Sequence, residues 1–494
     1  MMWRWIGGAL ALLGLVLCVR AVMLQSDVPV ASEWTPEVLD EAAMLERFRG
    51  GLRIPTVSLQ PGQGMDEEAF TAFRAYLAHH YPRVHAKLER ETVSEHSLLF
   101  RWPGSDPSLA GTVLLAHQDV VPVDKGSEGD WVHPPYAAVV EGGFIWGRGS
   151  LDDKFGLFSI LEAVENLLAE DFQPRRSLYL VFGHDEELGG PNGAVPIARL
   201  FAERRWPIGL VLDEGGAIAQ GMVPGLDAPV ALVGVAEKGY MSVILEVEGM
   251  GGHSSAPPDQ SAIGILSAAI TRLEENRFPM RLDGATRAFF EEGIGPASSF
   301  GMRLVYANLW LLEPLFLRAL ESSPLMASMV RTTTAPTIFH AGLKENVLPA
   351  RAQATVNFRL LPGESGALVL DRVRKVIDDG RVTVSPLSEA RESSPSSRID
   401  SAAFATVSTT IREVFPGTVI APYLLLGGTD SRYFRELCDC VYRFLPIALE
   451  PDGLRRAHGT NERIPLEGFS QGARFFRRLI ENAEAARLGG DGAS

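Results

Sequence analysis

Cysteine is scarce in this chain of 494 residues, which holds Cys18, Cys438 and Cys440 and no other. Three thiols cannot supply a disulfide framework or a thiolate zinc site. Basic charge is also in deficit, and a formal net charge of −15 argues against a nucleic-acid backbone as partner. Hydrophobic residues at 46% and charged residues at 22% are ordinary globular values, which exclude wholesale disorder.

Residues 1–30 differ in kind from the rest of the chain. Arg4 precedes an uncharged run from Trp5 to Val19, and four more apolar residues follow Arg20. This layout is typical of an export signal, and the segment also suffices to span a bilayer if Arg20 reaches the interface. No clear small-x-small cleavage site is present, which favours a retained anchor over cleavage. We therefore expect an exported protein that is either membrane-anchored or secreted or periplasmic.

The stretch Val113–Lys154 carries a metal-binding pattern. It begins with an apolar run suited to a buried strand, and His117 and Asp119 follow at the end of this run. The imidazole can bind a cation while the carboxylate holds its other ring nitrogen. After a Gly-Arg-Gly turn come Asp152 and Asp153, which repel each other unless a cation lies between them or one side chain turns away.

Further apolar strands along the chain also end in acidic or imidazole groups. Strand and helix patterns alternate, which predicts a mostly parallel sheet whose strand ends gather at one edge. Imidazole and carboxylate without thiolate suit zinc, and also manganese or cobalt. A two-metal site needs terminal ligands, a bridging carboxylate and an unligated base, and spacing does not decide which of Glu186 and Glu187 is that base. The strand-end groups are His117, Asp119, Asp152, Glu186, Glu187, Asp213 and His458.

The pattern of predicted strands and helices changes near Glu237, which indicates a domain inserted into a larger one. Residues 237–392 follow the order strand, helix, strand, strand, helix, strand, and a long apolar helical region interrupts this order at Thr286–Thr332. We therefore predict an α/β protein. Residues 31–236 and 393–494 build its mostly parallel-sheet domain, and the insertion forms a ferredoxin-like α+β lid.

Eight motifs together resemble metallopeptidase family 20, and they occur in order between residues 40 and 480. The most similar branch holds carboxypeptidase S and the N-fatty-acyl-amino-acid hydrolases. The resemblance implies a peptidase domain with two zinc ions and a lid that often mediates homodimer formation. The motifs are HQDVVPV, the stretch from WVHPPY to GRGSLDDK, GHDEELGG, LDEGG, GGHSSAP, NFRLLPG, LLGGTDSR and AHGTNE.

The resemblance also implies the metal ligands. Asp152 would bridge the two ions. His117 and Asp213 would hold one of them, and Glu187 and His458 would hold the other.

Further roles follow from the same resemblance. Glu186 would be the general base, and Asp119 would orient His117. Asp153 would follow a strained peptide bond. His253 would be a lid histidine that stabilises the oxyanion, in several family members from the partner subunit. The positions that would hold the α-carboxylate of the substrate are Arg359, Gly427, Gly428 and Thr429.

The predicted reaction is hydrolysis of the amide bond before a free C-terminal amino acid, in a small peptide or an N-acyl-amino acid. Arg359 favours such substrates because a guanidinium grips a carboxylate at two points. A metalloaminopeptidase is the rival enzyme and would need a carboxylate for the substrate amine. An inactive binding module would normally have lost a ligand or the base. The apolar segment Phe300–Val330 is either a lipid-accepting groove or ordinary lid core.

Overall fold

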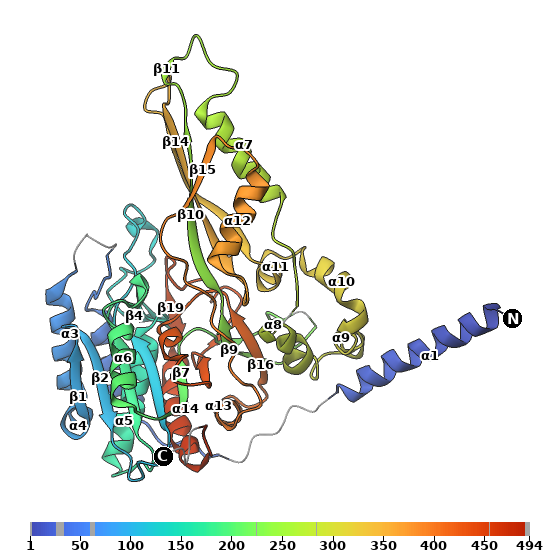
Figure 1. Ribbon diagram of the computed structural model, residues 1–494. Helices are drawn as coiled ribbons and strands as arrows, with labels where there is room; N and C mark the ends of the chain where they lie inside the picture. The colour runs from blue at the N-terminus through green and yellow to red at the C-terminus, as the bar shows by residue number, and fades with distance from the viewer. Residues whose placement is uncertain are drawn as a thin grey trace.

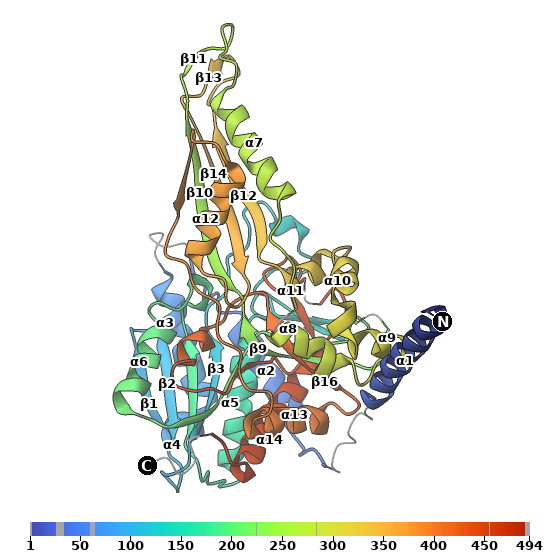
Figure 2. The ribbon, with the colours of Figure 1, turned by 45° about the vertical axis from the view of Figure 1, so that its right-hand side comes forward.

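The computed structural model describes residues 2–25, 34–59, 65–223, 225–282, 284–453 and 455–489. The predicted boundary between residues 30 and 31 lies outside these ranges. Figures 1 and 2 show a broad body, a narrow unit that rises from it, and an N-terminal helix that projects sideways.

A ten-stranded sheet forms the centre of the body, in the order β1-β2-β6-β3-β7-β17-β9-β8-β18 with β16 beside β9. The neighbours β6, β3, β7 and β17 run parallel, which confirms the mostly parallel α/β sheet. Apolar side chains fill these strands because helices cover the sheet. The bounds are β1 Glu89–Val93, β2 Ser97–Trp102, β3 Gly111–His117, β6 Leu178–Gly183, β7 Ile208–Asp213, β8 Ile218–Ala219, β9 Val230–Glu237, β16 Val419–Leu425, β17 Val441–Arg443 and β18 Ala448–Leu449.

Helix α5 (Lys154–Ala169) is buried over most of its surface because it packs on β3, on α2 and on α14. Asp153 caps its N-terminus by accepting a hydrogen bond from the Gly156 amide at 3.1 Å. Helix α6 packs on β6. The helices of the body are α2 Glu41–Leu52, α3 Glu67–His80, α4 Pro82–Lys87, α6 Ala194–Arg204, α13 Ala402–Val414 and α14 Leu466–Ala485.

The narrow unit is a four-stranded antiparallel sheet in the order β12-β14-β10-β15. Buried and part-exposed residues alternate along β14 because one face carries α7 and α12. The order of elements along the chain and across the sheet is that of the expected ferredoxin-like lid. The bounds are β10 Gly239–Glu248, α7 Ala262–Glu275, β12 Thr333–Ala341, β14 Arg351–Leu360, α12 Gly366–Ile377 and β15 Val382–Pro386.

The helical region between α7 and β12 shares its core with the body. Phe289, Phe290 and Phe316 pack with Val419 and Ala421 of β16, in a cluster separate from the core of the four-stranded sheet. The region Phe300–Val330 therefore packs with the body rather than with the four-stranded sheet, because the chain returns to the body before it enters β12. Its elements are α8 Gly284–Ala288, the π-helical turn η3 Phe289–Ile294, α9 Phe300–Tyr306, α10 Leu309–Leu320 and α11 Pro324–Val330.

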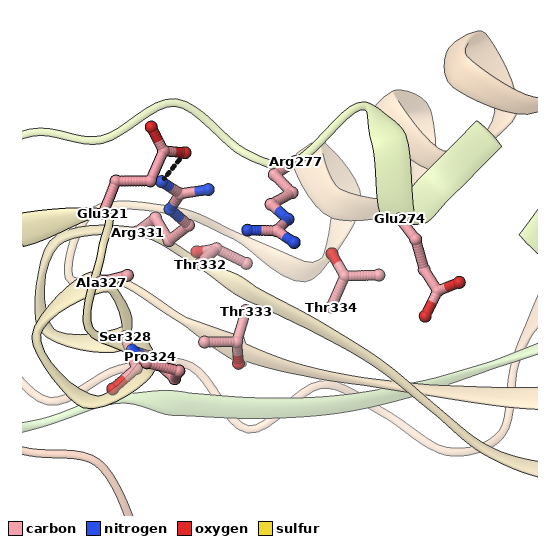
Figure 3. Close-up of a pocket in the computed structure, with 10 residues that line it drawn as sticks. All are labelled: Glu274, Arg277, Glu321, Pro324, Ala327, Ser328, Arg331, Thr332, Thr333 and Thr334. Carbon is pink, nitrogen blue, oxygen red and sulfur yellow. Dashed lines mark hydrogen bonds and ion pairs between the residues drawn. The ribbon is translucent and has the colours of Figure 1, made fainter. Parts of the chain in front are cut away.

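A cavity of about 290 Å³ marks the place where α11 meets β12 and α7. The guanidinium of buried Arg331 forms an ion pair with Glu321 at 2.8 Å beside this cavity (Figure 3). Thr332, Thr333 and Thr334 line it as well. Its lining residues differ from those predicted for the active site, so it is a separate feature of the junction.

Candidate active site

Three parallel strands bring acidic and imidazole groups to one edge of the sheet. His117 ends β3, the turn η2 (Glu186–Leu188) follows β6, and Asp213 ends β7. β3 pairs with both β6 and β7, so these strand ends are neighbours. The polar groups that the sequence pattern put at the carboxyl ends of the strands thus lie together at one edge of the sheet.

Asp152 lies at the centre of the cluster, with one imidazole at each carboxylate oxygen. Its Oδ1 is 2.9 Å from His117 Nε2, and its Oδ2 is 2.9 Å from His458 Nε2. His458 Nε2 is also 3.1 Å from Glu187 Oε2, and His117 Nε2 is 3.6 Å from Glu214 Oε1. A carboxylate placed between two such donor sets has the geometry of a bridging ligand.

The buried carboxylate of Glu462 fixes this centre and was not foreseen from sequence. It accepts hydrogen bonds from the amides of Leu151 at 2.8 Å and Asp152 at 3.2 Å. Its other oxygen pairs with Arg148 at 2.6 Å. The short strands β4 (Val139–Glu141), β5 (Phe144–Trp146) and β19 (Arg463–Pro465) form one sheet, which anchors the segment that follows His458. The Asp152–Asp153 peptide bond is cis.

Asp119 organises the groups around His117. Its backbone oxygen is 2.9 Å from His117 Nδ1, and its Oδ1 lies 3.3 Å from the same nitrogen. Its carboxylate also accepts the amides of Glu186 and Glu187, each at 3.2 Å, and the Ser58 hydroxyl at 2.6 Å. One fully buried carboxylate therefore orients the imidazole and fixes the backbone of the Glu186-Glu187 pair.

Burial and mutual repulsion dominate the electrostatics of the cluster. Burial raises the pKa of Glu186 well above its usual value, and the charge of Asp430 adds to the shift. Burial also raises the pKa of Glu214, as does the charge of Asp152. Burial alone would lower the pKa of His117, but the Glu214 charge and the hydrogen bonds to Asp119 and Asp152 raise it. The site thus combines excess buried carboxylate with imidazoles that attract a proton, which is the environment that a bound cation relieves.

Glu214, rather than Asp213, lies beside His117. Asp213 points away, because its Oδ1 accepts the Glu214 amide at 3.0 Å and its Oδ2 accepts the Ser431 amide at 2.7 Å. Suitable ligand atoms of His117, Glu186 and Glu214 lie within 4.8 Å of one another. Glu214, rather than the expected Asp213, is therefore the residue of this pair that stands with His117 and Glu186. Glu214, the neighbouring acidic residue in LDEGG, is a site residue that sequence reasoning missed.

Arg359 stands in a cluster of three guanidinium groups, with Arg391 and Arg432. Arg359 and Arg391 both stack on Tyr240, with the guanidinium carbons 4.9 Å and 4.7 Å from the ring centre. Arg432 donates a hydrogen bond to the Gly189 carbonyl at 3.3 Å, and Arg391 lies against the same glycine. Burial lowers the pKa of Arg359, and the charges of Arg391 and Arg432 act in the same direction. Among the described residues none of the three arginines forms an ion pair, so the cluster can accept an external anion.

The predicted loop at Gly427, Gly428 and Thr429 lines the same cavity as the carboxylates. This cavity of about 220 Å³ is also lined by Asp152, Glu186, Glu214 and His458. Thr429 donates its hydroxyl to Glu237 Oε1 at 2.9 Å, and Arg443 Nε donates to the same oxygen at 2.6 Å. The Gly427–Thr429 loop is thereby tied to Glu237, the last residue of β9.

His253 is the predicted residue that the structure does not bring to the cluster. It lies in β11 (Gly252–His253), which pairs with β13 (Val347–Leu348) at the far tip of the narrow unit (Figure 1). Its side chain is exposed, and Nδ1 accepts the Ser255 amide at 3.1 Å.

The fold and this cluster define a class, the metal-dependent hydrolases. The donor set fits a cation because it holds two imidazoles and several carboxylates, and the buried Oε1 of Glu187 has no hydrogen-bond partner among the described residues. Residues 113–482 match the model of "Peptidase family M20/M25/M40". The chain belongs to this peptidase family, which confirms the resemblance seen in its motifs.

Two relatives and one solved structure illustrate the similarity. The chain is 39% identical over 483 residues to "Probable carboxypeptidase S-like 2" of Dictyostelium discoideum, covering 95% of this chain and 92% of the relative. It is 39% identical over 460 residues to human "N-fatty-acyl-amino acid synthase/hydrolase PM20D1", covering 92% and 90%. An M20 family metallo-carboxypeptidase from Sulfolobus solfataricus, Sso-CP2, has the same fold, with a TM-score of 0.65, 17% identity and coverage of 91% and 100%.

Replacement of Glu214 separates the two possible ligands at the end of β7. We expect Glu214→Gln to lose one equivalent of bound metal, because the carboxamide is a poorer ligand than the carboxylate beside His117. The matched variant Asp213→Asn should keep its metal, because that side chain accepts backbone amides. Metal content measured by atomic absorption after dialysis tests both. Metal loss confined to Asp213→Asn would return the ligand role to Asp213.

Proposed function

We propose that the protein hydrolyses the amide bond before a free C-terminal amino acid, in N-acyl-amino acids or small peptides. The cluster of Arg359, Arg391 and Arg432 beside the Glu186 carboxylate carries this proposal. Three unpaired guanidinium groups are a receptor for a carboxylate, which both kinds of substrate share. The carboxypeptidase and N-fatty-acyl-amino-acid hydrolase names of the relatives support the same class. An aminopeptidase would need an anionic group where these arginines stand.

The metal site would hold two zinc ions, with cobalt or manganese as substitutes. His117 and Glu214 would hold one ion, His458 and Glu187 the other, and Asp152 would bridge them. When bound, such ions supply Lewis acidity, which polarises an amide carbonyl and acidifies a water molecule. The two oxygens of Asp152, each 2.9 Å from a different imidazole, support this division.

Glu186 is the proton carrier in this proposal. Its raised pKa suits a carboxylate that takes a proton from water and returns it to the leaving nitrogen. Asp119 holds the backbone of Glu186 and Glu187, so the base and the ligand keep a fixed relation. Arg359 and the Gly427–Thr429 loop hold the substrate carboxylate, which places the scissile amide at the carboxylate cluster.

His253 would act from a second subunit. Its place at the tip of the narrow unit separates it from the cluster of its own chain (Figure 2). A homodimer in which each tip reaches the other site would supply the missing oxyanion donor.

The N-terminal helix α1 (Met2–Met23) would direct export and then serve as a membrane anchor. It is long and apolar enough to cross a bilayer, and its side chains up to Arg20 are largely exposed. Cleavage with release of a secreted or periplasmic protein is the alternative outcome.

Replacement of the base should separate chemistry from metal binding. Glu186→Gln should keep its full metal content and lose about 10²- to 10⁴-fold in kcat, because general acid–base catalysis typically contributes that much. Glu187→Gln serves as the matched variant and should lose metal. Metal analysis and kcat on N-acyl-amino acids measure both effects. If Glu186→Gln loses the metal and Glu187→Gln keeps it, the two roles are exchanged.

Removal of Arg359 should reveal the group that the substrate presents. Arg359→Ala should lower kcat/KM for N-acyl-amino acids by about 10- to 100-fold, since a hydrogen bond to a charged group contributes about 1.5–3 kcal/mol. Turnover of the corresponding C-terminal amides, if they are cleaved, should hardly change. Arg372→Ala is the control because Arg372 also stacks on a ring, that of Phe278, but on the outer helix α12. An equal fall on acids and amides would remove Arg359 from the carboxylate site.

A reporter fusion tests the N-terminal segment. Residues 1–30 fused to a reporter should carry it to or across a membrane, because Arg4 and the apolar run form an export signal. Fractionation of cells and protease protection measure the outcome. A reporter that stays soluble in the cytoplasm would contradict the proposed export.

A further inference from the structure

Five large apolar side chains are exposed on the helical region between α8 and β12. The exposed fractions are 57% for Trp310, 71% for Leu315 and 58% for Leu325. Phe300 and Leu311 are exposed to 47% and 42%. We call these five residues the apolar rim. They lie on α9, α10 and α11, and α10 contacts both of the other helices, so the five residues form one candidate interaction surface.

The last two turns of α1 are bound to the same region. Arg20 Nε donates to the Ala307 carbonyl at 2.8 Å, and Arg303 Nε donates to the Ala21 carbonyl at 3.2 Å. Ala21 is fully buried in this contact. The remainder of α1 projects away from the body, as Figures 1 and 2 both show.

The contact continues into the apolar part of α1. Asn308 Nδ2 donates to the Leu17 carbonyl at 3.1 Å, and Leu17 belongs to the uncharged run that would lie in the bilayer. The indole of Trp310 donates to Asn308 Oδ1 at 3.4 Å. The beginning of α10 is therefore held at the depth where the proposed anchor enters the membrane. Tryptophan is enriched at that depth because its ring is apolar and its N–H is polar.

We infer that the apolar rim enters the interfacial layer of the bilayer beside α1, so that the body rests on the membrane through two adjacent contacts. This inference rests on the proposed anchor role of α1. The partner is the boundary between lipid headgroups and acyl chains. With a net charge of −15, the chain gains little from anionic lipids, so apolar insertion rather than charge attraction holds the rim.

A row of aromatic rings connects the rim to the active site. Phe316 of α10 packs on Phe290 with ring centres 4.8 Å apart, and Phe290 packs on Phe289 at 4.9 Å. Phe289 in turn lies 6.3 Å from Tyr423 of β16, the strand that leads into the Gly427–Thr429 loop. The rim and the substrate loop thus belong to one packed unit, which keeps the site at a fixed height above the membrane and suits substrates that carry an acyl chain.

Site-specific fluorescence in the full-length protein tests the inference. An environment-sensitive thiol probe is attached at native Cys18, which is exposed on α1, while Cys438 and Cys440 are buried. In a Cys18→Ser background the probe is attached at Leu315→Cys on the rim. Leu343→Cys, at an exposed residue of the narrow unit, is the matched control. The protein is reconstituted in phosphatidylcholine vesicles whose acyl chains carry nitroxide quenchers.

Quenching at Cys18 and at Leu315→Cys, with none at Leu343→Cys, is the expected result. Quenching at Cys18 alone would overturn the rim contact and leave the anchor standing. Quenching at Leu315→Cys alone would contradict the anchor, and with it the pair of adjacent contacts that the inference requires. No quenching at either site would overturn both, and quenching at Leu343→Cys as well would show nonspecific adsorption and overturn the rim contact.

Discussion

The crowding of carboxylates around Asp152 is the constraint on which the structure depends. Glu186, Glu187 and Glu214 share this space with it, and burial together with like charges raises the pKa of Glu186 and Glu214. Left alone, such a cluster would favour protonation or an open fold. Backbone amides and two imidazoles offset the repulsion between the carboxylates instead, and the site is suited to a cation that would offset it further. The metal dependence of the family is thus the natural consequence of how the strand ends are built.

Segments that are far apart in the sequence hold this cluster in place. Glu462, near the end of the chain, binds the backbone of Leu151 and Asp152. Asp119 binds the backbone after β6. These supports come from the body, and the long insertion between β9 and α13 supplies none of them. The insertion instead contributes Arg359 and Arg391, which stack on Tyr240, and a helical region that shares the core of β16.

Much of the fold and of the candidate site could be predicted because both follow from strand ends. Apolar runs that finish in His117 and Asp213 predicted a parallel sheet, and the motifs supplied the family. The position of Glu214, rather than Asp213, beside His117 could not be predicted, because it depends on which carboxylate accepts the Ser431 amide. Arg391 and Glu462 were missed for a similar reason: each acts through a tertiary contact that leaves no local pattern. The packing of the helical region on β16 likewise depends on where the chain returns after α7.

Glu237 closes β9 and stands two residues before β10, at the base of the narrow unit. It also accepts the Thr429 hydroxyl and the Arg443 guanidinium. The next residue, buried Lys238, donates to the carbonyls of Ser328 and Arg331 at 2.9 Å and 2.8 Å. Glu237 and Lys238, at the base of the narrow unit, are therefore hydrogen-bonded to the Gly427–Thr429 loop and to the end of α11. Because Glu237 joins the base of the narrow unit to Thr429, which lines the cavity, the position of the narrow unit and the shape of the cavity are coupled through one side chain.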